Sequence, residues 1–376
     1  MSYFGLLTKT APGVIPAPEP VPAELLEGFT AHMVGHNASV RNLGGTTTDS
    51  EIVLVAETYD PVVTLPYIPG ETWTGHASIV MPDGTAHPLT VGGSRELSIS
   101  TATDADPLDG LKIPMRGAFF RVWSAGRVPG PSAWTGRSKR VGAGDLTTGG
   151  LIPEDRNRRD DPTVPYAIRG RSTYGGPQVL IVGDSITTIC TSLFTYSDAY
   201  GTFWSKPLME AGIPAIMTGV WGQSHADVID ADSLSEEGHR RFDAVLNAGH
   251  LTHALTEYGV NDIFGRGSAP WVRANALWSH LATSGLERWQ TTTTAYSPTG
   301  LAHERTPIRN EWNDGIRAGH PALTGYIEMA DVVESARDSG VWRDGTKYTA
   351  DGIHPNNAGL VLMREPIAAW AASIKA

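Results

Sequence analysis

The serine of a Gly-Asp-Ser motif at 183–185 lies where a buried strand should end and a helix should begin. The motif directly follows the apolar run 179–182, and ligand sites in open α/β sheets lie at such carboxyl ends. The first N–H groups of a helix and its dipole can stabilise developing negative charge. Ser185 is therefore a candidate nucleophile, while the alternative is that Asp184 or Ser185 only caps the helix.

A second motif, Asp-Gly-Ile-His-Pro at 351–355, precedes the apolar C-terminal stretch. It offers an imidazole with a carboxylate three positions earlier. His354 would remove the proton of a serine hydroxyl, Asp351 would fix the tautomer and stabilise the imidazolium, and His354 would then protonate the leaving alcohol. The alternative is that Asp351 and His354 are only surface residues beside the start of a helix. The presence of the other motifs makes this alternative less favoured.

Two loop motifs follow candidate strands between these two. In Gly-Val-Trp-Gly at 219–222, Gly222 would let the backbone approach a reacting carbonyl and offer an N–H, although a tight turn explains it equally well. In Gly-Val-Asn-Asp at 259–262, the Asn261 amide would lie at the same sheet edge as Ser185 and donate to an oxyanion. Asn and Asp are also common in turns, so neither motif is decisive alone.

Together these motifs resemble the blocks of the SGNH hydrolases, also called the GDSL esterase/lipase superfamily, which supply Ser, Gly, Asn and His in that order. Here they are Ser185, Gly222, Asn261 and His354. The resemblance covers about half the chain, from Gln178 to the C-terminus.

The resemblance implies a three-layer α/β/α sandwich with a parallel, flavodoxin-like sheet. It further implies a triad of Ser185, His354 and Asp351, and an oxyanion hole from the N–H groups of Ser185 and Gly222 with the Asn261 side chain. Asp184, Trp221 and Asp262 are possible pocket residues. Many members carry a small residue where this chain has Trp221, which puts the assignment of Gly222 in doubt.

The pattern of apolar, turn-forming and charged residues changes along the chain and predicts three segments. Residues 1–125 are predicted to form a β-rich accessory domain, for which a β-sandwich is one arrangement, because short apolar stretches alternate with turn residues. Residues 126–176, rich in Gly, Pro and Arg, read as an exposed linker. Residues 177–376 read as the hydrolase domain. Its predicted strands and helices are strands at 179–182, 215–218, 254–258, 291–295 and 326–330, with helices at 271–281 and 358–374.

The net charge and the hydropathy of the chain limit the partners and the location that we expect. The net charge of -11 over 376 residues disfavours nucleic acid and anionic membrane surfaces as partners. No apolar run is long enough to span a membrane, and no signal peptide is evident, so we expect a soluble protein, cytoplasmic by default. Oligomeric state and natural compartment stay open.

Few other side chains are candidates for catalysis or metal binding. Cys190 is the single cysteine and reads as a helix-packing residue. His250 and His253 lack an evident third ligand, so we expect neither a metal nor a cofactor. His225, which follows Gly222, could face the pocket, but a surface loop position is favoured.

The leading hypothesis is therefore a serine esterase that acts through an acyl-enzyme on a small-molecule or glycan ester, with acetylated carbohydrate favoured. The alternatives are a carbohydrate-binding or attachment protein with an auxiliary hydrolase domain, an acyltransferase, or a longer-chain lipase that uses the same residues.

Overall fold

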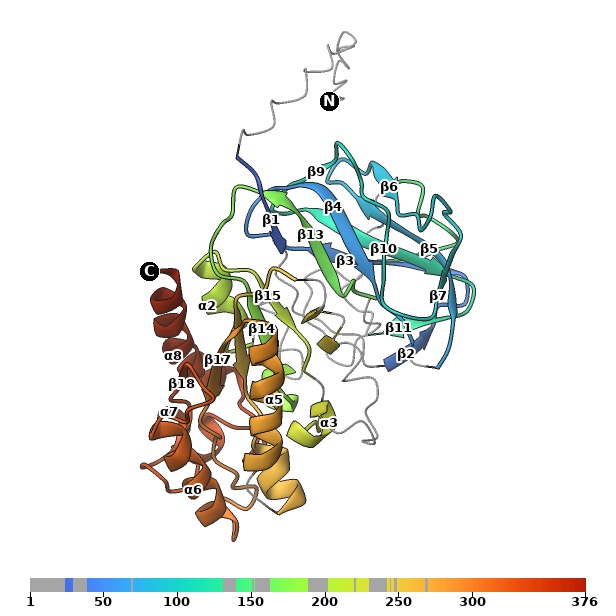
Figure 1. The fold of residues 1–376 in the computed structure, drawn as a ribbon. Helices are drawn as coiled ribbons and strands as arrows, with labels where there is room; N and C mark the ends of the chain where they lie inside the picture. The colour runs from blue at the N-terminus through green and yellow to red at the C-terminus, as the bar shows by residue number, and fades with distance from the viewer. Residues whose placement is uncertain are drawn as a thin grey trace, which may run out of the picture.

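The structure is a computed structural model that describes residues 24–29, 39–68, 70–130, 140–150, 152, 163–188, 202–219, 221–229, 242–243, 245–246, 249–267 and 270–376. Two halves lie side by side (Figure 1): a β-rich half, residues 24–172, and an α/β half, residues 177–376. Cys190 and the N-terminal segment assessed for a signal peptide lie outside the described residues.

The β-rich half contains two larger antiparallel sheets, with strand orders β1-β13-β4-β8 and β12-β3-β10-β5-β6, and a small sheet of β11 and β2. β9 pairs with β4, and β7 pairs with β5. The strands are β1 Leu26–Phe29, β2 Ser39–Asn42, β3 Thr46–Ile52, β4 Thr58–Leu65, β5 Trp73–Val80, β6 Ala86–Pro88, β7 Leu97–Ile99, β8 Thr103–Asp104, β9 Lys112–Ile113, β10 Ala118–Ser124, β11 Arg127–Gly130, β12 Arg140–Ala143 and β13 Ala167–Ser172.

Strand β10 shows how this half is held together. Phe120 and Val122 are fully buried in the core. Arg121 of the same strand is also buried, and its guanidinium forms a two-point ion pair with Asp49 on the neighbouring strand β3, with N···O distances of 2.6 and 2.8 Å. A buried cation persists only with such a partner.

The segment 126–176 differs from the linker expected from its composition. Its described residues include β11, β12 and β13, and β13 lies between β1 and β4 in one of the larger sheets. The sequence of β13, Ala-Ile-Arg-Gly-Arg-Ser, has little apolar alternation, so its periodicity is weak. Pairing with two neighbouring strands stabilises it instead. Residues 131–139, 151 and 153–162 of this segment lie outside the described residues.

The α/β half is built on a five-stranded sheet in the order β15-β14-β16-β17-β18, and every neighbouring pair is parallel. Its strands are β14 Val179–Val182, β15 Ala215–Met217, β16 His253–Thr256, β17 Glu287–Thr291 and β18 Gly325–Ile327. Its helices are α1 Ser185–Thr188, α2 Ser205–Glu210, α3 His225–Ile229, the π-helical turn η2 Asn261–Gly265, α5 Trp271–Thr283, α6 Thr306–Arg317, α7 Ala330–Val333, the 3-10 turn η3 Gly345–Lys347 and α8 Asn357–Lys375.

Successive residues of β14 point into different core clusters, as strand geometry requires. Leu180 and Val182 join a cluster that includes Leu277 and Leu281 of α5. Val179 and Ile181 join another cluster, with Leu208 of α2 and Leu360 of α8. Helices thus cover both faces of the sheet, and the strand is apolar throughout because neither face meets water.

The predicted elements match the observed ones best where the apolar pattern is strongest, at β14, α5 and α8. Two strands are displaced: β17 was expected at 291–295 and lies at 287–291, and β18 was expected at 326–330 and lies at 325–327. Residues 291–294 are all threonine, a β-branched residue that favours strands, which explains the expectation. However, the backbone N–H of Thr293 donates to the Asn313 side chain rather than to a strand.

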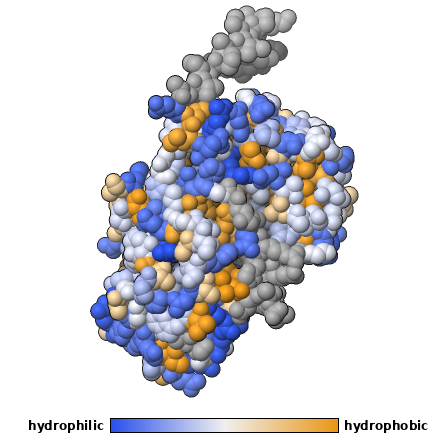
Figure 2. All heavy atoms as spheres, viewed as in Figure 1, coloured by the Kyte–Doolittle hydropathy of each residue, from blue (hydrophilic) through white to orange (hydrophobic). Residues whose placement is uncertain are grey.

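The two halves make contact along one seam. A methyl group on Gly28 of β1 would meet the Gln178 side chain at the start of β14, and Arg116 contacts Met209 of α2. Figure 2 shows apolar residues gathered where the halves meet on this face. None of the helices in the described ranges combines the length and apolar character needed to cross a bilayer.

Candidate active site

The sheet topology brings the sequence motifs to one edge. Ser185 begins α1 directly after β14, and Asn261 begins η2 shortly after the adjacent strand β16. Gly183 makes the turn into α1 possible because a Cβ at this position would overlap the Thr187 hydroxyl and crowd Glu257. The carboxyl ends of parallel strands therefore hold Ser185 and Asn261 near each other.

Ser185, His354 and Asp351 form a continuous hydrogen-bonded chain. His354 Nε2 lies 2.9 Å from Ser185 Oγ, and His354 Nδ1 lies 2.7 Å from Asp351 Oδ2. In the tautomer that donates from Nδ1 to Asp351, Nε2 accepts the serine hydroxyl. The arrangement can transfer the serine proton to the imidazole.

The loop at 349–355 presents the imidazole and the carboxylate together. Asp351 Oδ1 accepts the backbone N–H groups of Ile353 and His354 at 2.9 and 2.8 Å. Partial burial acts to raise the pKa of Asp351, but these hydrogen bonds and the His354 imidazole outweigh it, so the pKa lies below its usual value. Asp351 is therefore an anion, as a partner of an imidazolium must be.

Gly352 allows the 349–355 loop to pack closely against the backbone at Ser297. Its φ is +78°, and a side chain there would overlap the Ser297 carbonyl. The Gly352 carbonyl accepts the Ser297 N–H at 2.8 Å. Any other residue would be strained here, so the position is tied to the docking of the loop.

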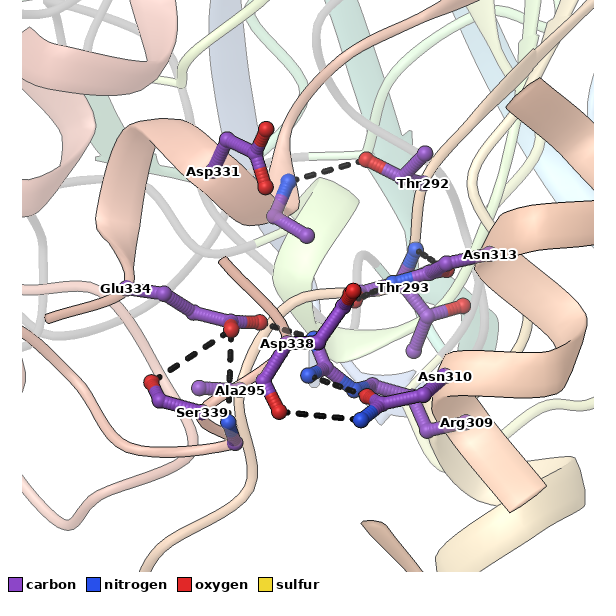
Figure 3. Close-up of polar contacts among 12 residues, drawn as sticks. Thr292, Thr293, Ala295, Arg309, Asn310, Asn313, Asp331, Glu334, Asp338 and Ser339 are labelled. Carbon is purple, nitrogen blue, oxygen red and sulfur yellow. Dashed lines mark hydrogen bonds and ion pairs between the residues drawn. The ribbon is translucent and has the colours of Figure 1, made fainter. Parts of the chain in front are cut away.

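A buried polar cluster supports the segment that carries Ser297 (Figure 3). Arg309 and Glu334, both fully buried, form an ion pair, and Arg309 also donates to the Thr293 carbonyl at 3.2 Å. Glu334 accepts the Gly340 N–H at 3.2 Å. The cluster ties α6 and the residues after α7 to the chain that follows β17.

Asp184 caps the helix and also contacts the asparagine motif. Its Oδ1 accepts the Ile186 N–H at 2.9 Å, and its Oδ2 accepts the Asn261 amide at 2.9 Å. Asp184 is fully buried. Burial raises its pKa to about 7, although the hydrogen bonds from Ile186, Glu257 and Asn261 act in the opposite direction. The capping role considered from the sequence and a contact with the site thus occur in the same side chain.

The Asn261 amide links three parts of the site. Besides Asp184 Oδ2, its nitrogen donates to the Gln223 carbonyl at 2.8 Å, which anchors the residue that follows Gly222. An amide nitrogen has two hydrogens. A substrate oxyanion would therefore have to share one of these N–H groups with its present acceptor.

Trp221 and Gly222 lie on the exposed side of the site. The Trp221 ring stacks on the His354 imidazole with a centroid separation of 6.2 Å, and 43% of the residue is exposed. Gly222 is exposed and has a φ of +75°. Trp221 is thus placed beside the reacting groups with a face available to solvent.

Asp262 lies in the interior and pairs with a buried histidine. Its Oδ2 lies 3.0 Å from His225 Nδ1. The surface position expected for His225 is wrong, because His225 is fully buried and its ring contacts Tyr258, Trp278 and Trp312. α3 begins at His225, and the helix places this residue in the interior.

Sequence reasoning missed Glu257. It is buried, it accepts the Thr187 hydroxyl at 2.7 Å, and it forms a side-chain hydrogen bond with Asp184. The signal was a carboxyl residue inside the predicted buried strand 254–258, since a buried acid needs a specific partner.

Within the part of the chain that the structure describes, no three His, Cys, Asp or Glu side chains are grouped as metal ligands. His253 opens β16, one residue before the predicted strand start, and its Nε2 lies 3.4 Å from Glu287.

No protein-family model and no curated protein matches the chain. Among solved structures, it is similar to an active-site mutant of a family two carbohydrate esterase from Clostridium thermocellum, at 12% identity over 93% of this chain and 98% of that one, with a TM-score of 0.39. A psychrotrophic esterase from Pseudoalteromonas sp. is 18% identical over 52% of this chain and 97% of that one, with a TM-score of 0.37. A GDSL-like lipase from Bacteroides thetaiotaomicron is 14% identical over 52% and 88%, with a TM-score of 0.35. These three similar structures are thus a carbohydrate esterase, an esterase and a GDSL-like lipase.

Proposed function

We propose that this protein is a serine esterase whose α/β half is a three-layer hydrolase domain preceded by a β-rich accessory domain. The single observation that carries the proposal is the hydrogen-bonded chain from Ser185 Oγ through the His354 imidazole to Asp351, with distances of 2.9 and 2.7 Å. An arrangement of nucleophile, base and orienting carboxylate is what acyl transfer requires.

In the first half-reaction, His354 Nε2 takes the Ser185 proton as Oγ attacks the ester carbonyl carbon. The tetrahedral intermediate collapses when the alkoxide leaves with the proton from His354, and the acyl group stays on Ser185. In the second half-reaction, His354 deprotonates a water molecule, which attacks the acyl carbon. The carboxylic acid leaves, and the proton returns to Ser185.

The negative charge on the intermediate needs donors at the start of α1. We assign this role to the N–H groups of Ser185 and Gly222 and to the Asn261 amide. In support, Asn261 lies beside both strand-end motifs through its bonds to Asp184 and to the Gln223 carbonyl. Preorganised donors of this kind contribute about 10²- to 10³-fold each to turnover.

For the substrate, we propose a small-molecule or glycan ester, with short acyl groups such as acetyl on carbohydrate favoured. Trp221 supports this choice, because a half-exposed indole beside His354 offers an apolar face on which a sugar ring or short alkyl group can pack.

The first experiment compares hydrolysis of p-nitrophenyl acetate and longer-chain esters by the wild type and by Ser185→Ala. We expect activity in the wild type, highest on short chains, and loss of turnover in the variant with an unchanged circular dichroism spectrum. Acetate release from acetylated sugars then tests the carbohydrate substrate. Inactivity of the wild type on every ester, together with resistance to a fluorophosphonate probe, would contradict the proposal.

A longer-chain lipase or an acyltransferase would use the same residues. The chain-length profile separates the lipase from the short-chain esterase, and product analysis with competing alcohols separates transfer from hydrolysis. Glycan binding by the β-rich half would favour the carbohydrate-binding alternative.

A further inference from the structure

Two carboxyl groups meet in the interior directly behind the nucleophile. Glu257 follows the last residue of β16 and is 3% exposed, and Asp184 precedes Ser185 and is fully buried. Their side chains form a hydrogen bond with each other. The reaction steps derived above use neither group.

Hydrogen-bond donors surround both carboxyl groups, and the effect of each carboxyl on the pKa of the other shows which one keeps the proton. Asp184 accepts from the Ile186 N–H with Oδ1 and from the Asn261 amide with Oδ2. Glu257 accepts the Thr187 hydroxyl at 2.7 Å, and the backbone N–H of Asp184 also donates to it. Two carboxyl groups can hydrogen-bond to each other only if one carries a proton, because two carboxylates in contact repel. Contact with Glu257 lowers the pKa of Asp184, whereas contact with Asp184 raises the pKa of Glu257, so Asp184 loses its proton first, at a pKa of about 7. Above that pH the remaining proton lies on Glu257, which donates it to the Asp184 carboxylate.

We propose that Glu257 is a positioning residue of the esterase, which in its protonated form holds the Asp184 carboxylate against both the start of α1 and the Asn261 amide. This inference rests on the proposed function. Through Asp184, Glu257 sets the orientation of Asn261, and Asn261 in turn holds the Gln223 carbonyl beside Gly222. A series of hydrogen bonds thus connects the end of β16 to the groups assigned to the oxyanion hole.

The surroundings favour the protonated form. Burial, and then the charge of Asp184, raise the pKa of Glu257 well above its usual value. Asp262 adds a further carboxyl that raises the pKa of Asp184, although it also pairs with His225. The adjacent Tyr258 is buried, so its pKa is raised, and Asp227 of α3 contributes to that rise.

Loss of the shared proton has a defined consequence. At high pH the pair becomes two carboxylates in contact, and their repulsion would displace Asp184 from Asn261. We expect kcat to fall on the alkaline side for this reason while KM changes little, since the interaction is used in the transition state.

The test compares Glu257→Gln with Glu257→Leu. A glutamine amide can donate to Asp184 while its carbonyl accepts from Thr187, so it reproduces the protonated acid but cannot titrate. We expect Glu257→Gln to keep kcat within a few-fold at neutral pH and to lose the alkaline fall. We expect Glu257→Leu to lower kcat by about 10²-fold, as loss of one oriented donor does.

Glu287→Gln is the matched control, because Glu287 also lies on the parallel sheet but its side chain is 53% exposed and pairs with His253. Its pH profile should equal that of the wild type. Urea unfolding at each pH separates loss of function from loss of fold.

A merely structural role would show as equal losses of kcat in Glu257→Gln and Glu257→Leu, or as an alkaline limb that Glu257→Gln leaves in place. Either outcome, in a wild type that is active, would overturn the positioning role alone. An inactive wild type would remove the proposed function, and this inference would fall with it.

Discussion

The two aspartates near Ser185 lie in opposite surroundings. Asp351 lies in a surface loop with 48% of its side chain exposed, and its pKa is lowered because hydrogen bonds from Ile353 and His354 outweigh partial burial. Asp184 is fully buried next to another carboxyl, and burial raises its pKa to about 7. The comparison shows that the same residue type serves as a fixed anion in one region and as a proton-sharing partner in the other, because solvent and donors differ.

The largest effect is expected from Asp351→Asn. The amide cannot stabilise the imidazolium and favours the wrong tautomer of His354, so kcat should fall by about 10⁴-fold while the fold is retained. Steady-state hydrolysis of p-nitrophenyl acetate measures it. A fall of less than tenfold would mean that the exposed aspartate is not the orienting group.

Asn261→Ala should have the next largest effect. It removes the amide that connects the buried carboxylate to the Gln223 carbonyl, and kcat should fall by about 10²- to 10³-fold. The urea midpoint of the variant serves as the control for folding. Unchanged turnover would remove Asn261 from the oxyanion hole and leave it only a structural link.

The two aspartates should also give opposite pH dependences of stability. The pKa of Asp184 is about 7 in the folded protein against an ordinary value of 3.8, so between these pH values the folded state keeps a proton that the unfolded state has lost. Its contribution to the free energy of unfolding therefore falls as pH rises through this window. The contribution of Asp351 is complete above pH 3.8 and is lost as pH falls through its lowered pKa.

Urea unfolding from pH 4 to 8 tests this contrast. In Asp184→Asn, the decline in stability across the window should be reduced, whereas in Asp351→Asn it should persist. Parallel profiles for the wild type and Asp184→Asn would show that the buried aspartate is ionised throughout the range.

The smallest effect on catalysis is expected from substitution of Trp221, which lies on the exposed side of the site, as Asp351 does. In Trp221→Ala, loss of one aromatic contact should raise KM by about threefold to tenfold with little change in kcat. Trp221→Phe should recover most of the affinity. An unchanged KM for both acetyl esters and acetylated sugars would show that the ring contributes no substrate contact.

The chemistry-bearing positions could be predicted from sequence to a considerable extent. The apolar runs before 183 and 259 marked strand ends, and the structure brings Ser185, Asp184 and Asn261 to one sheet edge. His354 and Asp351 then complete the hydrogen-bonded triad with Ser185. These features are local, because a buried parallel strand is apolar along its whole length and the motif follows it directly. The helices α5 and α8 were predictable because their apolar residues recur at helical spacing.

What only the tertiary structure decided depends on groups distant in sequence. Strand β13 is held by β1 and β4, and its own polar sequence does not specify it. His225 is buried because three aromatic rings from elsewhere surround it. The sequence alone determined which residues can act as nucleophile, base and donor. The charge states of Asp184 and Glu257 were decided by folding, because burial raises the pKa of both carboxyl groups and the charge of Asp184 raises the pKa of Glu257 further.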